Sequence, residues 1–224
     1  MDKKKKIFKS ITSSYLELDE LITRVLCDSA TSGRVEAAYL FGETKDNQSS
    51  VLKAAGFLYS LGPVKKLGLC GMPEGFGYPG FKNWRNELVE MGVKKEDIYS
   101  VPPSDKFPPS TDAEAWGLVD YAKNNGWKSV FIIAPPLHQL RAFVSVVSAV
   151  VKSKSNLLVY SFPGIPQSWE EHITHSQGIL KGTRSELLAN ELAKIEKYYK
   201  NGDLISAAEV LKYMDERDKR VARY

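Results

Sequence analysis

Residues 128–141 have the sequence KSVFIIAPPLHQLR. Lys128–Ala134 is rich in β-branched and aromatic residues, which is typical of a strand buried on both faces of a sheet. Two prolines follow this run, and residues 137–152 then place apolar side chains at helical spacing. The stretch therefore predicts a buried strand, a short connection and a helix, which together are the repeating unit of α/β proteins.

The same alternation continues on both sides of this stretch. The expected strands are Glu36–Phe41, Lys66–Cys70, Asp97–Val101, Lys128–Ala134 and Leu157–Ser161. The expected helices between them cover about 48–61, a segment through Leu88 and Met91, 112–124 and 137–152. Near-continuous apolar strands joined by helices, with right-handed crossovers, predict a doubly wound, mainly parallel, Rossmann-like sheet of about five strands.

Helical segments are expected on both sides of this sheet. The predicted division is a basic tail and N-terminal helix (1–34), a Rossmann-like domain (35–162), and a linker with a C-terminal helical hairpin (163–224). A loop-rich link over 163–182 precedes two amphipathic helices near 183–200 and 204–217. Gly202 suits the end of the first of these helices, and Asp203 is a suitable cap for the second. The hairpin is expected to pack on the sheet domain or on a second subunit.

The composition is that of an ordinary globular protein, with 43% hydrophobic and 26% charged residues in a chain of 224. The formal net charge of +4 at first suggests a nucleic-acid partner, but residues 1–9 (MDKKKKIFK) contain five lysines against one aspartate. This tail accounts for the whole excess, and the rest of the chain is neutral. A short basic tail binds polyanions only weakly, so no specific nucleic-acid partner is expected.

The sequence predicts neither export nor membrane insertion. The basic N-terminus leads into polar residues, and the apolar stretch near 142–151 is shorter than the ~20 residues that span a bilayer. Cys27 and Cys70 lie in no recognisable motif and fit a reduced chain better than a disulfide framework. We therefore expect a cytoplasmic protein without a membrane span.

Ligands of open α/β sheets bind outside the carboxyl ends of the strands. The loops expected at that edge are 42–46, 70–80, 102–114 and 135–141. His138 and Arg141 lie three residues apart at the start of a helix, so their side chains share one face. A histidine transfers protons near neutral pH and an arginine grips a phosphate or carboxylate, which makes this pair the strongest candidate site. The alternative is that His138 caps the helix and Arg141 pairs with a surface acid.

A second candidate is the start of the helix expected at 112–124. Thr111 is a suitable N-cap, and free backbone N–H groups at a helix start can hold an anion. Asp112 and Glu114 would repel that anion unless a metal or a cationic ligand intervenes. Ordinary capping, with acidic residues in the first turn, explains the same pattern.

Two further segments carry reactive side chains. The glycine-rich loop Cys70–Gly80 lacks the spacing of a dinucleotide or Walker A motif, and is expected to shape a pocket or to act as a flexible lid. Cys70 is a candidate nucleophile, although a buried cysteine at a strand end is commoner. His172 and His175 have the spacing of a weak metal motif with Glu171, but we expect exposed or interface histidines and no metal site.

Several of these segments together resemble the YdcF-like (SanA and ElyC-type) family of Rossmann-like proteins, over roughly residues 36–162. The matching segments are Ala38–Gly42, Leu69–Gly71, Leu88–Val93 with Asp97 and Ile98, Thr111, and Leu137–Ala142. The last of these, LHQLRA, resembles the family signature Phe-His-x-x-Arg-Ala and is the most specific. The resemblance implies a ligand pocket that contains His138 and Arg141, and it makes S-adenosylmethionine a candidate cofactor.

The chain also departs from the family pattern. Aligned on Thr111 and Ala115, the family's Thr-x-Glu-Asn-Ala has Ala113 and Glu114 in place of its Glu-Asn pair. The acidic residue usual before the second helix is replaced by Gly80 or Asn83. The resemblance therefore implies a retained pocket with an altered set of polar groups, and it implies a fold more strongly than a reaction.

Three hypotheses about function follow. In the first, the protein is a hydrolase or transferase acting on a phosphorylated or nucleotide-like ligand, with His138 as acid or base, Arg141 as anion clamp, and Glu114 or Asp112 as a base or orienting group. In the second, it binds a nucleotide or S-adenosylmethionine without chemistry. In the third, the C-terminal hairpin makes it an oligomeric scaffold. The candidate ligand-binding residues are Gly42, Glu43, Thr44, Cys70, Gly71, Thr111 and Arg141.

Overall fold

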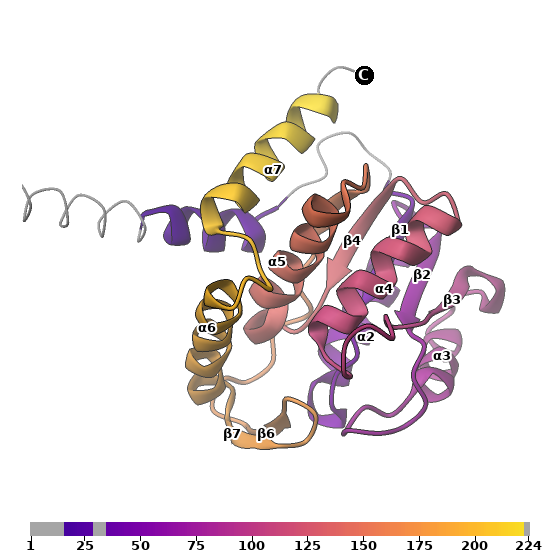
Figure 1. Ribbon diagram of the computed structural model, residues 1–224. Coiled ribbons are helices and arrows are strands. Elements are labelled where there is room, and N and C mark those ends of the chain that lie inside the picture. Colours follow the sequence, from indigo (N-terminus) through magenta and orange to yellow (C-terminus); the bar gives the residue numbers. More distant parts are fainter. Residues whose placement is uncertain (1–15, 29–34, 222–224) are drawn as a thin grey trace, which may run out of the picture.

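Five parallel strands form the centre of the computed structural model, which describes residues 16–28 and 35–221 (Figure 1). The strands are β1 (Ala37–Leu40), β2 (Lys66–Cys70), β3 (Ile98–Val101), β4 (Ser129–Ile133) and β5 (Leu158–Ser161). Their order is β3-β2-β1-β4-β5, and every neighbouring pair is parallel. The chain thus builds outward from β1 in one direction and then outward from β4 in the other, as in a doubly wound sheet.

Helices cover both faces of this sheet. They are α2 (Lys45–Ser60), α3 (Phe81–Glu90), α4 (Thr111–Asn124) and α5 (Pro136–Ser153). Tyr39 and Phe41 pack in one core with α4 and α5, whereas Ala38 and Leu40 pack in a second core with α2 and α3. This alternation along one strand buries apolar side chains on both faces, as a parallel sheet requires. The predicted Rossmann-like α/β fold is confirmed.

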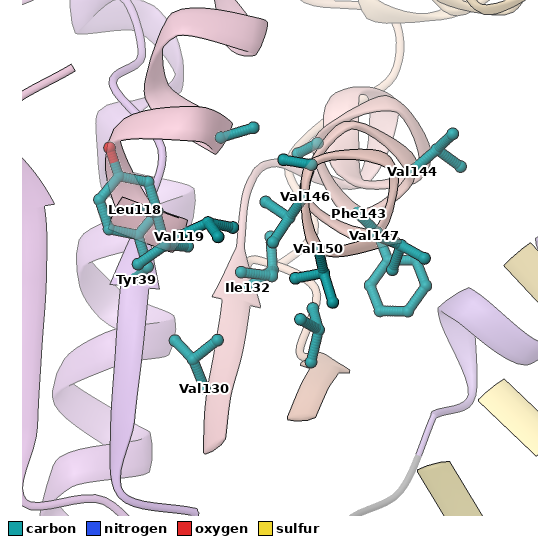
Figure 2. Close-up of a cluster of buried hydrophobic side chains, with 14 of the residues drawn as sticks. Tyr39, Leu118, Val119, Val130, Ile132, Phe143, Val144, Val146, Val147 and Val150 are labelled. Carbon is teal, nitrogen blue, oxygen red and sulfur yellow. The ribbon is translucent and has the colours of Figure 1, made fainter. Parts of the chain in front are cut away.

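Helix α5 is buried along most of its length because other elements enclose it. Figure 2 shows Val146 of α5 close to Ile132 of β4, while Val144 and Phe143 lie on the side of the helix away from the strand. That outer side is covered by α6 (Arg184–Lys200) and α7 (Ala207–Val221), which both pack on α5 (Figure 1). The first turn of α5, which carries the predicted site, is therefore held firmly against the sheet.

The two ends of the chain add to the same core. Residues 1–15 and 29–34 of the predicted N-terminal segment lie outside the described residues, but residues 16–26 are helical. Leu21 and Val25 of this helix are buried in the core that contains α4, α5 and α7. Within the described residues, none of the helices is both long enough and apolar enough to cross a bilayer.

The start of α4 differs from the prediction. Its N-cap is Ser110, whose side chain accepts a hydrogen bond from the backbone N–H of Ala113 at 3.2 Å. Thr111 is therefore the first helical residue and not the cap. The difference matters for the site, because a capping hydroxyl is committed to the helix, whereas the Thr111 hydroxyl is available to other side chains.

The C-terminal part also contains elements that the sequence did not predict. An antiparallel pair, β6 (His172–His175) and β7 (Leu180–Thr183), replaces most of the second half of the segment expected to be a loop-rich link, and β7 extends one residue beyond it. Gly202 follows α6 with a φ of +80°, a backbone conformation that favours glycine, as expected. Asp203 does not cap α7, because Ser206 does so by exchanging hydrogen bonds with Glu209.

Candidate functional site

A pocket of about 520 Å³ lies at the carboxyl ends of β1 and β4. This is the point where the strand order reverses, which is the usual ligand site of open α/β sheets. The loops after β1 and β2 and the first turns of α4 and α5 form its floor, and the β6–β7 hairpin with α6 forms its outer wall. Most of the predicted site residues line it: Gly42, Glu43, Thr44, Cys70, Thr111, Glu114, His138 and Arg141.

Gln139 fixes the start of α5 beneath this pocket. Its side chain accepts a hydrogen bond from the Ala134 N–H at 2.7 Å, and it donates to the carbonyl of Ile132 and to the Ser161 hydroxyl. These bonds join α5 to the ends of β4 and β5. His138 and Arg141 lie in the same part of α5 as Gln139, so these bonds also fix their positions.

A hydrogen-bonded chain of three side chains, two of them buried and one half-buried, lies in the floor of the pocket. Nδ1 of His138 is hydrogen-bonded to Oε1 of Glu43. Glu43 comes immediately after Gly42, in the loop that follows β1. Nε2 of His138 lies 3.2 Å from the hydroxyl of Thr111. A carboxyl group, a histidine and a hydroxyl in this order are the arrangement in which a carboxylate orients a histidine that then acts as a base.

Arg141 connects this chain to a second group of charges. Its Nη1 donates to the Thr111 hydroxyl, and its Nε donates to Oε2 of Glu191 at 2.5 Å. Lys194 lies one turn further along α6 and places Nζ 2.6 Å from Oε1 of Glu191. Nη2 of Arg141 has no hydrogen-bond partner among the described residues, so it remains available to a ligand in the pocket.

His175 is buried in the same cluster, which corrects the prediction of an exposed or interface histidine. Its Nε2 lies 3.1 Å from Oε1 of Glu191, and its Nδ1 lies 3.7 Å from Oε2 of Glu43. His172, at the other end of β6, is exposed. Because residues three apart in a strand point to opposite faces, the two histidines cannot bind one metal ion together. Among the described residues, no group of three His, Cys, Asp or Glu side chains is arranged to hold a metal ion.

Glu114 forms a separate polar contact on the floor of the pocket. Its Oε2 accepts hydrogen bonds from the Tyr39 hydroxyl and from the Gly42 N–H, each at 2.9 Å. A Cβ at Gly42 would come within 3.3 Å of the Cys70 Cβ and 3.4 Å of the Glu114 carboxylate, so a glycine here lets the backbone approach closely. Burial raises the pKa of Glu114 to about 7. Burial, together with the nearby Glu114, also raises the pKa of Cys70, which argues against a reactive thiolate.

The other titratable groups of the cluster have strongly shifted pKa values. Burial, followed by the charges of Glu191 and Glu114, raises the pKa of Glu43 well above its usual range. Burial and the nearby charge of Arg141 lower the pKa of His138. Burial opposes ionisation of Glu191, but the hydrogen bond from His175 and the charge of Arg141 outweigh it and hold its pKa well below normal. The resting cluster therefore contains a neutral His138 and an ionised Glu191.

Two predicted residues lie outside the pocket. Asp112 is partly buried at the start of α4, and burial raises its pKa. The N–H of Gly71 donates to the Val101 carbonyl at 2.8 Å, and a Cβ there would lie 2.7 Å from the Ser100 Oγ. Gly71 thus permits close contact between the ends of β2 and β3 instead of close approach of a ligand.

Three residues of the site were not among the predicted ones. Glu191 and Lys194 have no local sequence signal, because each lies in an ordinary amphipathic helix. His175 was noticed only as one member of a weak metal motif. His175 and Lys194 line the pocket, and Glu191 is bonded to both of them. These positions follow from the packing of α6 on α5 and of the β6–β7 hairpin on α2 and α6, which no local pattern encodes.

Comparison with known proteins adds little to this description. No protein-family model and no curated protein matches the chain. A search of solved structures found the HAD domain of effector protein Lem4 from Legionella pneumophila, with 8% identity and a TM-score of 0.33 over 62% of this chain and 91% of that one. An inactive mutant of the same domain is similar at 9% identity, with the same TM-score, over 74% of this chain and 98% of that one. Similarity at this level supports no conclusion about function.

Proposed function

We propose that the protein is an enzyme that transfers or hydrolyses a group on a phosphorylated or nucleotide-like small molecule. The observation that carries this proposal is the hydrogen-bonded chain Glu43–His138–Thr111, which lies in the pocket floor next to the free Nη2 of Arg141. In this proposal Arg141 holds the anionic group of the ligand, and His138 receives or returns a proton through the Thr111 hydroxyl.

The energetic cost of the cluster supports a functional role. Burying a charged group costs several kcal/mol of folding free energy unless it is well paired, and apolar residues of similar size would often stabilise the fold more. Here the pKa shifts of Glu43, Glu114 and His138 all favour the neutral form of each side chain. The fold therefore gathers, at one place, three ionisable groups in surroundings that disfavour their charged forms. Such groupings are concentrated at functional sites.

The resemblance of LHQLRA to the YdcF-like signature is consistent with the same pocket, and it is the reason for including S-adenosylmethionine among the ligands to test. A pocket of about 520 Å³ lies within the range of small-molecule and cofactor sites. A non-catalytic binding protein would use the same Arg141 contact, so the two functions differ only in whether a product forms.

The test is a thermal-shift screen followed by product detection by mass spectrometry. The panel contains nucleotides, nucleotide sugars, sugar phosphates and S-adenosylmethionine; a ligand at a hundredfold excess over its Kd stabilises the protein by about 2.7 kcal/mol. We expect Arg141→Gln to weaken the shift, and His138→Asn to keep the shift but lower turnover by about 10²- to 10⁴-fold. Asn is chosen because its amide can still donate to Glu43.

The matched control is His172→Asn, which replaces the exposed histidine of β6 and should change neither binding nor turnover. Binding by wild type without any product would replace the proposed enzyme with a binding protein. Turnover that survives His138→Asn would remove this histidine from the mechanism, and the absence of any ligand would remove the proposed substrate class.

A further inference from the structure

His175 is a buried histidine for which the proposed function has no role. Its Nε2 contacts Glu191, but its Nδ1 has no hydrogen-bond partner among the described residues. This nitrogen faces Oε2 of Glu43 at 3.7 Å, and it lies in the wall of the pocket. A buried polar atom left without a partner costs roughly 1–3 kcal/mol of folding free energy, so its position needs a physical reason.

On the His138 side, Arg141 can only donate, and its Nη1 donates to the Thr111 oxygen. The Thr111 O–H can then donate to Nε2 of His138, which lies 3.2 Å away. A neutral His138 that accepts at Nε2 carries its proton at Nδ1. It therefore donates that proton to Oε1 of Glu43.

The direction on the His175 side follows from Glu191. This carboxylate accepts from Nε of Arg141 and Nζ of Lys194, and its pKa is held well below normal, so it also accepts from Nε2–H of His175. A neutral His175 that donates from Nε2 presents a lone pair at Nδ1. Nδ1 lies 3.7 Å from Oε2 of Glu43, just beyond hydrogen-bond distance. A carboxylate there would repel the lone pair, whereas a carboxylic acid would donate a hydrogen bond to it after a small approach.

We propose that Glu43 is a protonated carboxyl group that relays a proton between His138 and His175, which makes His175 the group that stores the proton withdrawn from the pocket. The hydrogen bonds then run in one direction from Arg141 through Thr111, His138, Glu43 and His175 to Glu191, and Arg141 closes a ring by donating directly to Glu191 as well. This ring is called the relay ring below.

The proposed transfer moves one proton at each position and no electrons. A proton from the pocket bonds to Nε2 of His138, and the Nδ1–H of His138 passes to Oε1 of Glu43. The proton on Oε2 of Glu43 passes at the same time to Nδ1 of His175. The products are His138 with its proton on Nε2, a Glu43 that is still neutral, and a His175 cation that is bonded to ionised Glu191.

The charges around Glu43 come from every element packed on it. The groups that face Glu43 are His138 and Arg141 on α5, Glu191 and Lys194 on α6, Glu114 on α4 and His175 on β6. Burial and the two nearby carboxylates raise the pKa of Glu43, in agreement with a protonated carboxyl group. The location of the proton does not depend on the proposed function, whereas the direction of its transfer during turnover does.

The test uses nuclear magnetic resonance of ¹⁵N-labelled histidine in the full chain, which contains three histidines. His172→Asn identifies the exposed histidine and leaves the two of the relay ring. Near neutral pH we expect the proton of His138 on Nδ1 and that of His175 on Nε2. When acid is added, uptake of one proton by the relay ring should place a second proton on His175 and move the His138 proton to Nε2 in a single step.

Glu43→Gln is the informative variant, because its amide reproduces the two hydrogen bonds of a protonated Glu43 without a transferable proton. We expect this variant to keep the fold and the protonation of both histidines near neutral pH. When acid is added, the gain of a proton by His175 and the change of nitrogen at His138 should no longer occur together. Glu191→Gln is the contrast, because an amide cannot accept from Arg141, Lys194 and His175 as a carboxylate does. In this variant His175 should no longer keep its proton on Nε2.

Two results would overturn the relay. The first is a proton on Nε2 of His138 or on Nδ1 of His175 near neutral pH, which includes a charged form of either histidine. The second is a wild-type His138 that keeps its proton on Nδ1 over the whole titration. Neither result depends on a substrate, so a failed ligand screen would count against the proposed function and leave the relay to be decided by these spectra.

Discussion

Glu114 couples the stability of the fold to pH. Its pKa is raised from 4.5 to about 7, chiefly by burial, so between these values the folded protein keeps a proton that the unfolded chain has released. Stability from this group is therefore present at low pH and is lost as the pH rises through about 7. We expect Glu114→Gln to remove this loss, so that the variant gains about 1–3 kcal/mol relative to wild type between pH 5 and pH 8.

Urea unfolding at the two pH values measures this gain. Glu90→Gln, an exposed position on α3, is the matched control and should show no such difference. An equal effect of Glu114→Gln at both pH values would mean that Glu114 is ionised in the folded protein throughout the range.

Single residues of the site were predictable where the chain itself places them at the edge of the sheet. Glu43 and His138 lie just after β1 and β4, so the rule for open α/β sheets locates them from the amino-acid sequence alone. The rule does not give their partners. The Thr111 hydroxyl is free to contact His138 because Ser110 takes the capping role of α4, and both serine and threonine are suitable N-caps.

At the scale of elements, two helical glycines have opposite consequences. A Cβ at Gly117 in α4 would lie 2.2 Å from the Pro102 carbonyl oxygen, whereas one at Gly56 in α2 would meet the Met91 side chain at an ordinary 3.5 Å. We expect Gly117→Ala to destabilise the protein by about 1–3 kcal/mol despite the better helix propensity of alanine. The same clash should displace the first turn of α4, which carries Thr111, and weaken ligand binding.

Gly56→Ala is the matched substitution and should stabilise the protein by about 0.5–1 kcal/mol. Both values are measured by denaturant unfolding. A stable Gly117→Ala would show that α4 is able to move away from the loop after β3 without cost.

The elements themselves were largely predictable, and their exceptions have a common cause. The five strands and the helices between them have long, regular apolar patterns, which local sequence determines well. The β6–β7 hairpin does not: HITH and LKGT alternate only weakly, and Ile173 is one of few apolar anchors in it. These strands form because the hairpin docks on α2 and α6, through contacts such as the 2.6 Å bond from the Thr44 hydroxyl to the Thr174 carbonyl.

At the scale of the whole molecule, Arg217 joins the two ends of the described chain to the sheet. Its guanidinium donates to both carboxylate oxygens of Asp28 at 2.7 Å and to the Val159 carbonyl of β5, and it lies 4.4 Å from the centre of the Tyr160 ring. We expect Arg217→Met to destabilise the protein by about 3–5 kcal/mol, since it removes one partner of a buried ion pair.

Arg220→Met, an exposed position on the same helix, should change stability by less than about 0.5 kcal/mol. The double variant Asp28→Asn with Arg217→Met should recover part of the loss, because no buried charge is left behind. If Arg217→Met is as stable as Arg220→Met, α7 does not depend on this ion pair for its attachment.

The order in which the chain is synthesised determines when the relay ring is complete. Its members extend from Glu43 to Glu191, and a ribosome supplies them in that sequence. Sheet and α5 are synthesised before α6, so a growing chain can bring Glu43, Thr111 and His138 together while Arg141 still lacks its carboxylate. Only the arrival of α6 balances that buried cation and gives His175 its counter-ion. Chains that end before α6 therefore contain the floor of the pocket but neither its complete outer wall nor its complete set of charges, and the synthesis of α6 is the step that assembles the site.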